Sequence, residues 1–119
     1  MSILSTVLIV LVALEFFYIL YLETFATTSD ATSRVFNMTK EELKSKALNT
    51  LFKNQGIYNG LIGVGLLYSV FLSSNPIEMS RLLLIYIILV ALYGSITSDK
   101  KIILTQGGLA ILALISTFF

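Results

Sequence analysis

The sequence predicts an all-α protein, a four-transmembrane-helix bundle, and three observations point to that fold class. Of the 119 residues, 56% are hydrophobic and 13% are charged, whereas water-soluble domains carry about 25% charged residues. The mean hydropathy is +0.89. The apolar residues also gather in four runs of helical length. We therefore expect a single integral membrane domain over residues 1–119, in which a cytoplasmic amphipathic helix links the first two spans.

Four spans are expected, at about residues 3–22, 56–73, 80–97 and 102–119. The first has the length for a bilayer core, because twenty helical residues rise about 30 Å. Ser73, Ser74 and Asn75 followed by Pro76 end the second, since proline cannot continue a helix. No Lys or Arg precedes the first run and no small-residue cleavage site follows it, so we expect a retained helix rather than a signal peptide.

The composition excludes several function classes. The chain has no Cys, His or Trp, which excludes disulfides, Cys/His zinc sites and any triad that needs an imidazole. The net charge of +1 gives no electrostatic case for nucleic acid binding. No metal site and no cofactor are predicted.

The basic residues predict the topology. Five lie between the first and second spans and two, Lys100 and Lys101, between the third and fourth, while Arg81 alone lies between the second and third. The positive-inside rule places the two basic loops in the cytoplasm. We therefore expect a multi-pass protein of the plasma membrane with both termini outside.

The first loop is the one sizeable segment outside the expected spans. Thr39 and Glu42 are spaced as a capping box. An amphipathic helix should follow, with Leu43, Ala47, Leu48, Leu51 and Phe52 on its apolar face. It could be a surface helix that leads into the second span, or it could bind anionic lipid or a partner.

Glu15 is the leading candidate site residue, because an acid inside a membrane span is costly and should face the bundle interior. It could carry a proton, act as an acid or base, bind a cation, or only hydrogen-bond helix to helix. At helical rise it lies about 12 Å from the cytoplasmic end of its span, Asn59 and Tyr93 about 7 Å and Gln106 about 6 Å. These similar depths predict a polar pocket open to the cytosol, with Glu15 within direct or single-water reach of Tyr58 or Asn59. The candidate ligand-binding or proton-carrying residues are Glu15, Tyr18, Gln55, Tyr58, Asn59, Tyr93 and Gln106, with Glu23, Asn54 and Thr97 as secondary candidates.

Glycines predict close helix packing. Gly56 and Gly60 form a GxxxG step, and Gly63 and Gly94 add to the small surface. Because Gly56 is nearer the membrane surface, a larger residue is expected to cost more at Gly60.

Residues 54–60, NQGIYNG, resemble the NQGxYNG signature in the second helix of a family of small bacterial four-helix integral membrane proteins of unknown function. Segments around Glu15 and Glu23, around Tyr93 and around Gln106 are similar to the other helices of that family. The resemblance implies a four-helix membrane fold and no established activity.

Four functions remain open. The first is a pocket that binds a small molecule or lipid, with Glu15 as its ionisable group. The second is proton-coupled transport of a small molecule or cation, since the architecture resembles the small multidrug resistance transporters. The third is an isomerase-type membrane enzyme that uses Glu15 and Tyr58. The fourth is a purely structural or assembly protein. The expected partners are the lipid bilayer and other copies of the chain in a homo-oligomer.

Overall fold

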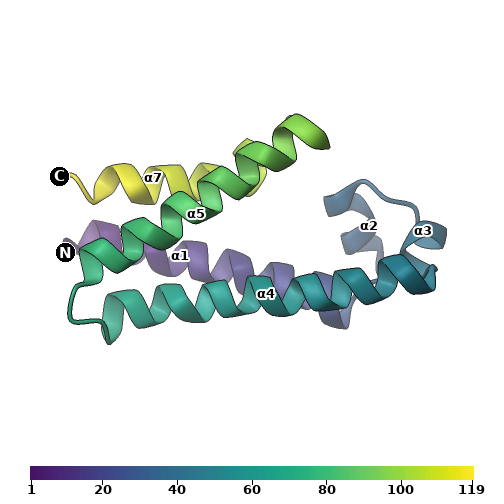
Figure 1. Cartoon of the computed structure of the whole chain (residues 1–119), viewed down its shortest axis with the longest axis horizontal. Coiled ribbons are helices and arrows are strands. Elements are labelled where there is room, and N and C mark those ends of the chain that lie inside the picture. The colour runs from purple at the N-terminus through teal and green to yellow at the C-terminus, as the bar shows by residue number, and fades with distance from the viewer. The chain divides into compact units, whose positions relative to one another are not determined.

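The computed structural model describes all 119 residues and contains helices without strands (Figure 1). The all-α prediction is confirmed. The elements in chain order are α1 (Ile3–Leu20), η1 (Tyr21–Phe25), α2 (Asp30–Phe36), α3 (Lys40–Lys44), α4 (Lys46–Phe71), α5 (Pro76–Thr97), α6 (Ile102–Thr105) and α7 (Gly108–Ser116).

The residues group into two compact units. The terminal unit contains Met1–Leu14 and Val64–Phe119, and the middle unit contains Glu15–Gly63. The long helices α1 and α4 contribute residues to both units.

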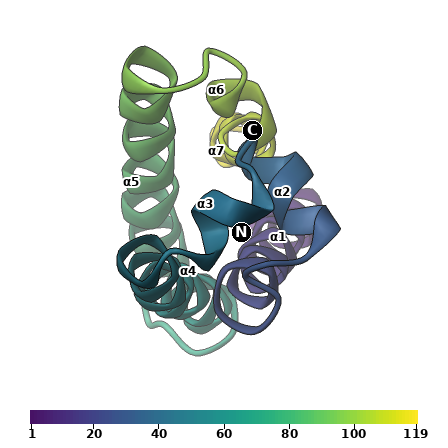
Figure 2. The same cartoon turned by 90° about the vertical axis from the view of Figure 1, so that its right-hand side faces the viewer.

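In the terminal unit α5 packs against α6 and α7 (Figure 2). Leu84, Ile87 and Ala91 form the buried stripe of α5, and Ala110 and Ala113 that of α7. Their spacing of three or four residues places each set on one helical face. The small alanines allow the two helices to approach closely.

Helix α5 begins earlier than expected. Pro76 is its first residue, and the side chain of Asn75 accepts a hydrogen bond from the backbone N–H of Glu78 at 3.4 Å. Proline suits a first helical position, because the N–H that it lacks would have no partner there. Pro76, which ends the second apolar run, is therefore also the first residue of α5.

The expected fourth helix is interrupted. Gln106 and Gly107 separate α6 from α7. A Cβ atom added at Gly107 would lie 2.7 Å from the carbonyl oxygen of Ile103 and 3.2 Å from the Cβ atom of Ala91. A side chain at position 107 would therefore require a shift of its neighbours. The structure has two short helices in place of one uninterrupted helix over residues 102–119.

In the middle unit α1 continues into the π-helical turn η1, where the N–H of Ala26 donates to the carbonyl of Tyr21, five residues back, at 2.9 Å. Ser29 caps α2, and Asn37 ends it in a left-handed conformation with φ of 53°. The predicted capping box of Thr39 and Glu42 is present and starts α3.

The amphipathic stretch after the capping box is not one separate helix. Ser45 has an extended backbone (φ −58°, ψ 137°) and ends α3 after five residues. Helix α4 begins at Lys46 and continues without a break into the expected second span. The side chain of Asn49 donates to the carbonyl of Leu43 at 3.1 Å and so joins the two helices.

Two helices are long and apolar enough to cross a membrane. Residues Ile3–Phe25 have a mean hydropathy of 2.6 and Pro76–Thr97 one of 2.0 in their most apolar windows. The expected second and fourth spans are not among these two helices. Amides and lysines make the first half of α4 more polar, and the last apolar run is divided into the short helices α6 and α7.

Candidate functional site

Glu23 and Asn59 form the polar centre of the middle unit. The Nδ2 group of Asn59 on α4 donates to Oε1 of Glu23 in η1 at 2.6 Å. Glu23 is only 3% exposed. Asn59 occupies one of the two carboxyl oxygens, and Oε2 has no protein hydrogen bond. We call this pair the Glu23–Asn59 centre.

The π-helical turn and α4 approach each other closely beside this centre. A Cβ atom added at Gly56 would overlap Oγ1 of Thr24 and lie 3.1 Å from the Cβ atom of Glu23. One added at Gly60 would lie 2.8 Å from Cδ2 of Leu20. An added Cβ would therefore meet neighbouring atoms at both glycines, and the closer contact is at Gly56 rather than at Gly60. Gly56 has the tighter contact, because it faces backbone and the short side chain of Thr24, whereas Gly60 faces the end of a flexible leucine.

Threonine hydroxyls satisfy the carbonyl groups around the turn. Oγ1 of Thr27 donates to the carbonyl of Glu23 at 2.7 Å. The fully buried Thr32 lies within 3.0 Å of the carbonyl of Leu22 and 2.6 Å of that of Ala26. A π-helical turn and a helix end leave carbonyls without helical partners. These contacts therefore stabilise the backbone that carries Glu23.

Lys53 of α4 also hydrogen-bonds this turn. Its Nζ atom donates to the carbonyl of Thr24 at 3.2 Å and to Oγ1 of Thr27 at 3.3 Å. Oγ1 of Thr24 in return donates to the carbonyl of Lys53 at 2.9 Å. Because the ammonium group is engaged by neutral oxygens and forms no ion pair with Glu23, the carboxyl group has no basic partner.

Glu15 forms no direct hydrogen bond with Tyr58 or Asn59. Asn59 bonds to Glu23, and Oε1 of Glu15 is buried without a hydrogen-bond partner. Tyr58 is 70% exposed. Glu15 lies eight residues before Glu23, about 12 Å along the helix. The contact of Gly56 with Thr24 therefore brings Glu23, rather than Glu15, to Asn59.

The remaining predicted residues are not drawn into one cluster. In the middle unit Tyr18, Asn54 and Gln55 are exposed, and Gly63 is buried. In the terminal unit Tyr93 is largely exposed, and Thr97 donates to its carbonyl at 2.9 Å. Gln106 lies in the turn before α7, and Gly94 contacts Ile102.

Glu23 was only a secondary candidate from the sequence, and four residues that hydrogen-bond its turn were not predicted: Thr24, Thr27, Thr32 and Lys53. The one available signal was the run of Thr and Ser after Glu23. We interpreted that run as irregular, although short hydroxyl side chains are suited to bonding the carbonyls of a helix end.

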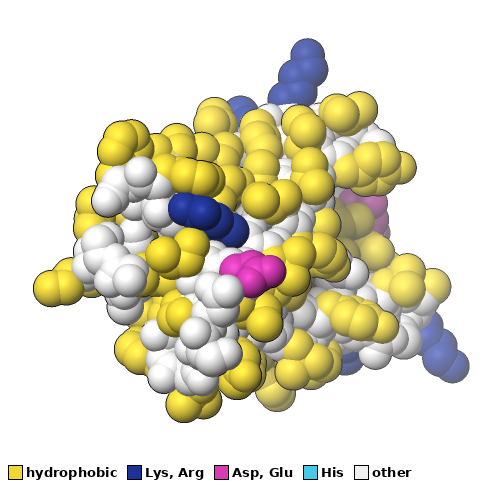
Figure 3. Space-filling model, turned by 60° about the vertical axis from the view of Figure 1, so that its left-hand side comes forward, with side chains coloured by type: hydrophobic (Ala, Val, Ile, Leu, Met, Phe, Trp, Pro, Cys, Tyr) yellow, Lys and Arg dark blue, Asp and Glu magenta, His cyan; other side chains and the backbone are white.

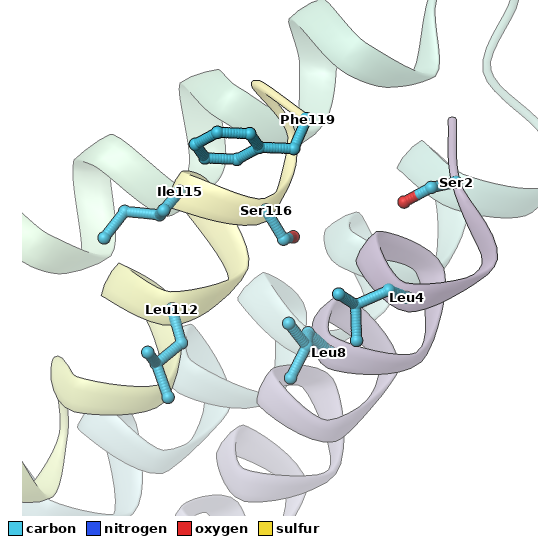
Figure 4. Close-up of a pocket in the computed structure, with 7 residues that line it drawn as sticks. All are labelled: Ser2, Leu4, Leu8, Leu112, Ile115, Ser116 and Phe119. Atoms are coloured by element: carbon cyan, nitrogen blue, oxygen red, sulfur yellow. The ribbon is translucent and has the colours of Figure 1, made fainter.

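The terminal unit contains an apolar groove of about 500 Å³ (Figure 4). Figure 4 shows Leu8 of α1 and Leu112 of α7 on opposite walls. Ser2 and Ser116 are its polar lining residues, and each hydrogen-bonds the buried Ser5, at 3.0 and 2.9 Å. The groove contains none of the predicted site residues and is not the expected polar pocket.

The chemistry available at the Glu23–Asn59 centre is that of a buried carboxyl group and an amide. Such a pair can bind a cation or a hydrogen-bond donor. No group of three or more His, Cys, Asp and Glu residues is placed to hold a metal ion.

Comparison with known proteins gives a family but no activity. An uncharacterized protein, YpaA, from Lactococcus lactis subsp. lactis (strain IL1403), is 75% identical over 119 residues, which is 100% of both chains. No solved structure matches the chain. Residues 10–118 match the family described as "Protein of unknown function (DUF1304)", and the chain therefore belongs to that family.

Proposed function

We propose that this protein is a four-span integral membrane protein that binds a small organic cation at the Glu23–Asn59 centre. The observation that carries the proposal is the 2.6 Å hydrogen bond between Asn59 and a carboxyl group that is 3% exposed and has no basic partner. An acid placed in a membrane-spanning segment is costly and commonly serves a site.

The exposed surface supports insertion into lipid. Figure 3 shows a face on which hydrophobic side chains predominate and charged ones are few. Leu82, Leu89, Tyr93 and Ile96 of α5 are among the exposed large hydrophobic residues. Only 22% of the most apolar window of α5 is buried, whereas the core helix of a water-soluble protein is mostly buried. Contiguous exposed apolar surface of this kind is typical of membrane or protein interfaces.

A lipophilic cation tests the site directly. Tetraphenylphosphonium should bind the purified protein in detergent, and Glu23→Gln should weaken binding at least tenfold, because it removes the charge while keeping the shape. Glu41→Gln is the matched control, since Glu41 is exposed and forms no ion pair or side-chain hydrogen bond. Equal affinities for the two variants and the unaltered protein would overturn the proposal.

Proton-coupled transport is the second candidate, and a specific observation favours it. Glu15 and Glu23 lie on the same candidate span, and Oε1 of Glu15 is buried without a partner. Two carboxyl groups at different depths could exchange protons for a cation as it crosses. Cells that express the protein should then extrude ethidium in a proton-gradient-dependent manner, and Glu15→Gln should abolish extrusion while leaving tetraphenylphosphonium binding intact. Binding of tetraphenylphosphonium without extrusion of ethidium would support cation binding and contradict transport.

A further inference from the structure

We infer that the segment between η1 and α4 is a docking surface for the anionic headgroups of membrane lipids. Its ligand groups are Arg34 at the end of α2, Lys44 at the end of α3 and Lys46 at the start of α4, which we call the basic segment. The inference rests on the proposed membrane insertion and is independent of the Glu23–Asn59 centre.

The cations of the basic segment are available to an external anion. All three side chains are exposed, and none forms an ion pair or a side-chain hydrogen bond. Lys44 and Lys46 flank Ser45, the single residue between two helices. The segment therefore contains three cations that no ion pair or side-chain hydrogen bond engages.

The neighbouring acids are largely engaged elsewhere. Asp30 forms an ion pair with Lys40. Glu42 accepts hydrogen bonds from the N–H and the hydroxyl of Thr39, both at 3.0 Å, in the capping box. Glu41 is the one acid of this segment without such a partner. Glu42 keeps its charge in the capping box, because its partners there are neutral. Over residues 30–46 four basic residues stand against three acidic ones, a net charge of +1, which complements a phosphate.

Apolar side chains of the same unit favour a lipid surface over a soluble anion. Phe25, Val35 and Leu51 are each more than half exposed. Cations together with exposed apolar groups are typical of segments that lie at the headgroup boundary. Arg34 also follows the candidate span Ile3–Phe25 by nine residues, and clusters of basic residues next to a span bind anionic lipids.

The test uses the full chain in nanodiscs of phosphatidylcholine alone or of phosphatidylcholine mixed with phosphatidylglycerol, whose anionic headgroups attract basic segments. Amide hydrogen exchange over residues 30–46 should slow when phosphatidylglycerol is present. In native mass spectrometry the protein should retain phosphatidylglycerol in preference to phosphatidylcholine. Changing Arg34, Lys44 and Lys46 together to Gln should remove both effects, with about a fivefold loss of retained lipid for each charge.

The matched control changes Lys100 and Lys101 to Gln. These residues are also exposed, unpaired and next to a candidate span, but they lie between α5 and α6. The control should keep the slowed exchange at residues 30–46. Equal exchange in both lipids, or an equal loss in the control, would overturn the inference. Release of the protein from cell membranes by alkaline carbonate would instead contradict the proposed insertion itself.

Discussion

Asn59 and Glu23 lie 36 residues apart in the chain and are joined by a 2.6 Å hydrogen bond. This bond joins a buried carboxyl group to an amide. If one of the two side chains is removed, the other has no hydrogen-bond partner to replace it. Such a loss costs about 1–3 kcal/mol when the remaining group is buried.

Asn59→Ala is therefore expected to lower the free energy of unfolding by about 1–3 kcal/mol, measured by thermal unfolding in detergent. Asn54→Ala is the matched control, because Asn54 is exposed and makes no side-chain hydrogen bond, and it should leave the melting temperature unchanged. A double-mutant cycle with Glu23→Leu, which removes the acceptor, isolates the pair. Additive effects of the two changes would show that the bond contributes nothing.

A second prediction concerns the contact between η1 and α4. Gly56→Ala should destabilise the protein by about 1–3 kcal/mol, the usual cost of overpacking, because the new methyl group would overlap Oγ1 of Thr24. Gly108→Ala should be neutral or stabilising, since no atom lies within 4 Å of the added Cβ and alanine favours helix.

Thr24→Ala distinguishes this contact from a general effect of alanine. It removes the clashing oxygen, so the double variant with Gly56→Ala should be more stable than the sum of the single changes predicts. Additivity would show that the methyl group at position 56 meets something other than Thr24.

The sequence predicted those features that depend on local chemistry. The capping box of Thr39 and Glu42 needs only a spacing of three residues, and the close approach at Gly56 and Gly60 follows from small side chains at helical spacing. The π-helical turn at Tyr21–Phe25 has no comparable local pattern. Expected depth in the membrane favours Glu15 over Glu23, whereas the structure pairs Asn59 with Glu23 through a contact between η1 and α4 that no local pattern defines. The interruption at Gln106 and Gly107 was also not predicted, because residues 102–119 form one apolar run in the sequence.

Thr32 supports the carbonyls of Leu22 and Ala26 through one hydroxyl group. Thr32→Val keeps the shape of this fully buried side chain and removes the one donor that the two carbonyls share. We expect a loss of about 1–3 kcal/mol in unfolding free energy and faster amide exchange over residues 21–26. Thr28→Val, at an exposed neighbour without a hydrogen bond, should change neither measurement. If both variants behave alike, the hydroxyl of Thr32 does not stabilise the turn.

The link between α2 and α3 should weaken in acid. Lys40, by its hydrogen bond and its charge, holds the pKa of Asp30 below its ordinary value of 3.8. A lowered pKa in the folded state means that the stabilising contribution is present above the ordinary value and is lost as pH falls through the lower folded value. Amide exchange of residues 30–44 should therefore accelerate below about pH 3.8, relative to the intrinsic rate. Lys40→Gln should remove this step. If the exchange still accelerates at the same pH in Lys40→Gln, another acid is responsible. Glu42 would be the candidate, because its hydrogen bonds with Thr39 lower its pKa.

The last prediction is the topology. Five basic residues between the first two expected spans favour the cytoplasmic side, because each is attracted by about 1 kcal/mol to the anionic inner leaflet. The chain has no native Cys, so single cysteines report their own side. Lys44→Cys should react with a membrane-impermeant maleimide only after the cells are permeabilised, whereas Ser74→Cys, at an exposed position between α4 and α5, should react in intact cells. Labelling of Lys44→Cys in intact cells together with protection of Ser74→Cys would reverse the orientation. Labelling of both in intact cells would show that α4 does not cross the membrane, and the four-span arrangement would then be wrong.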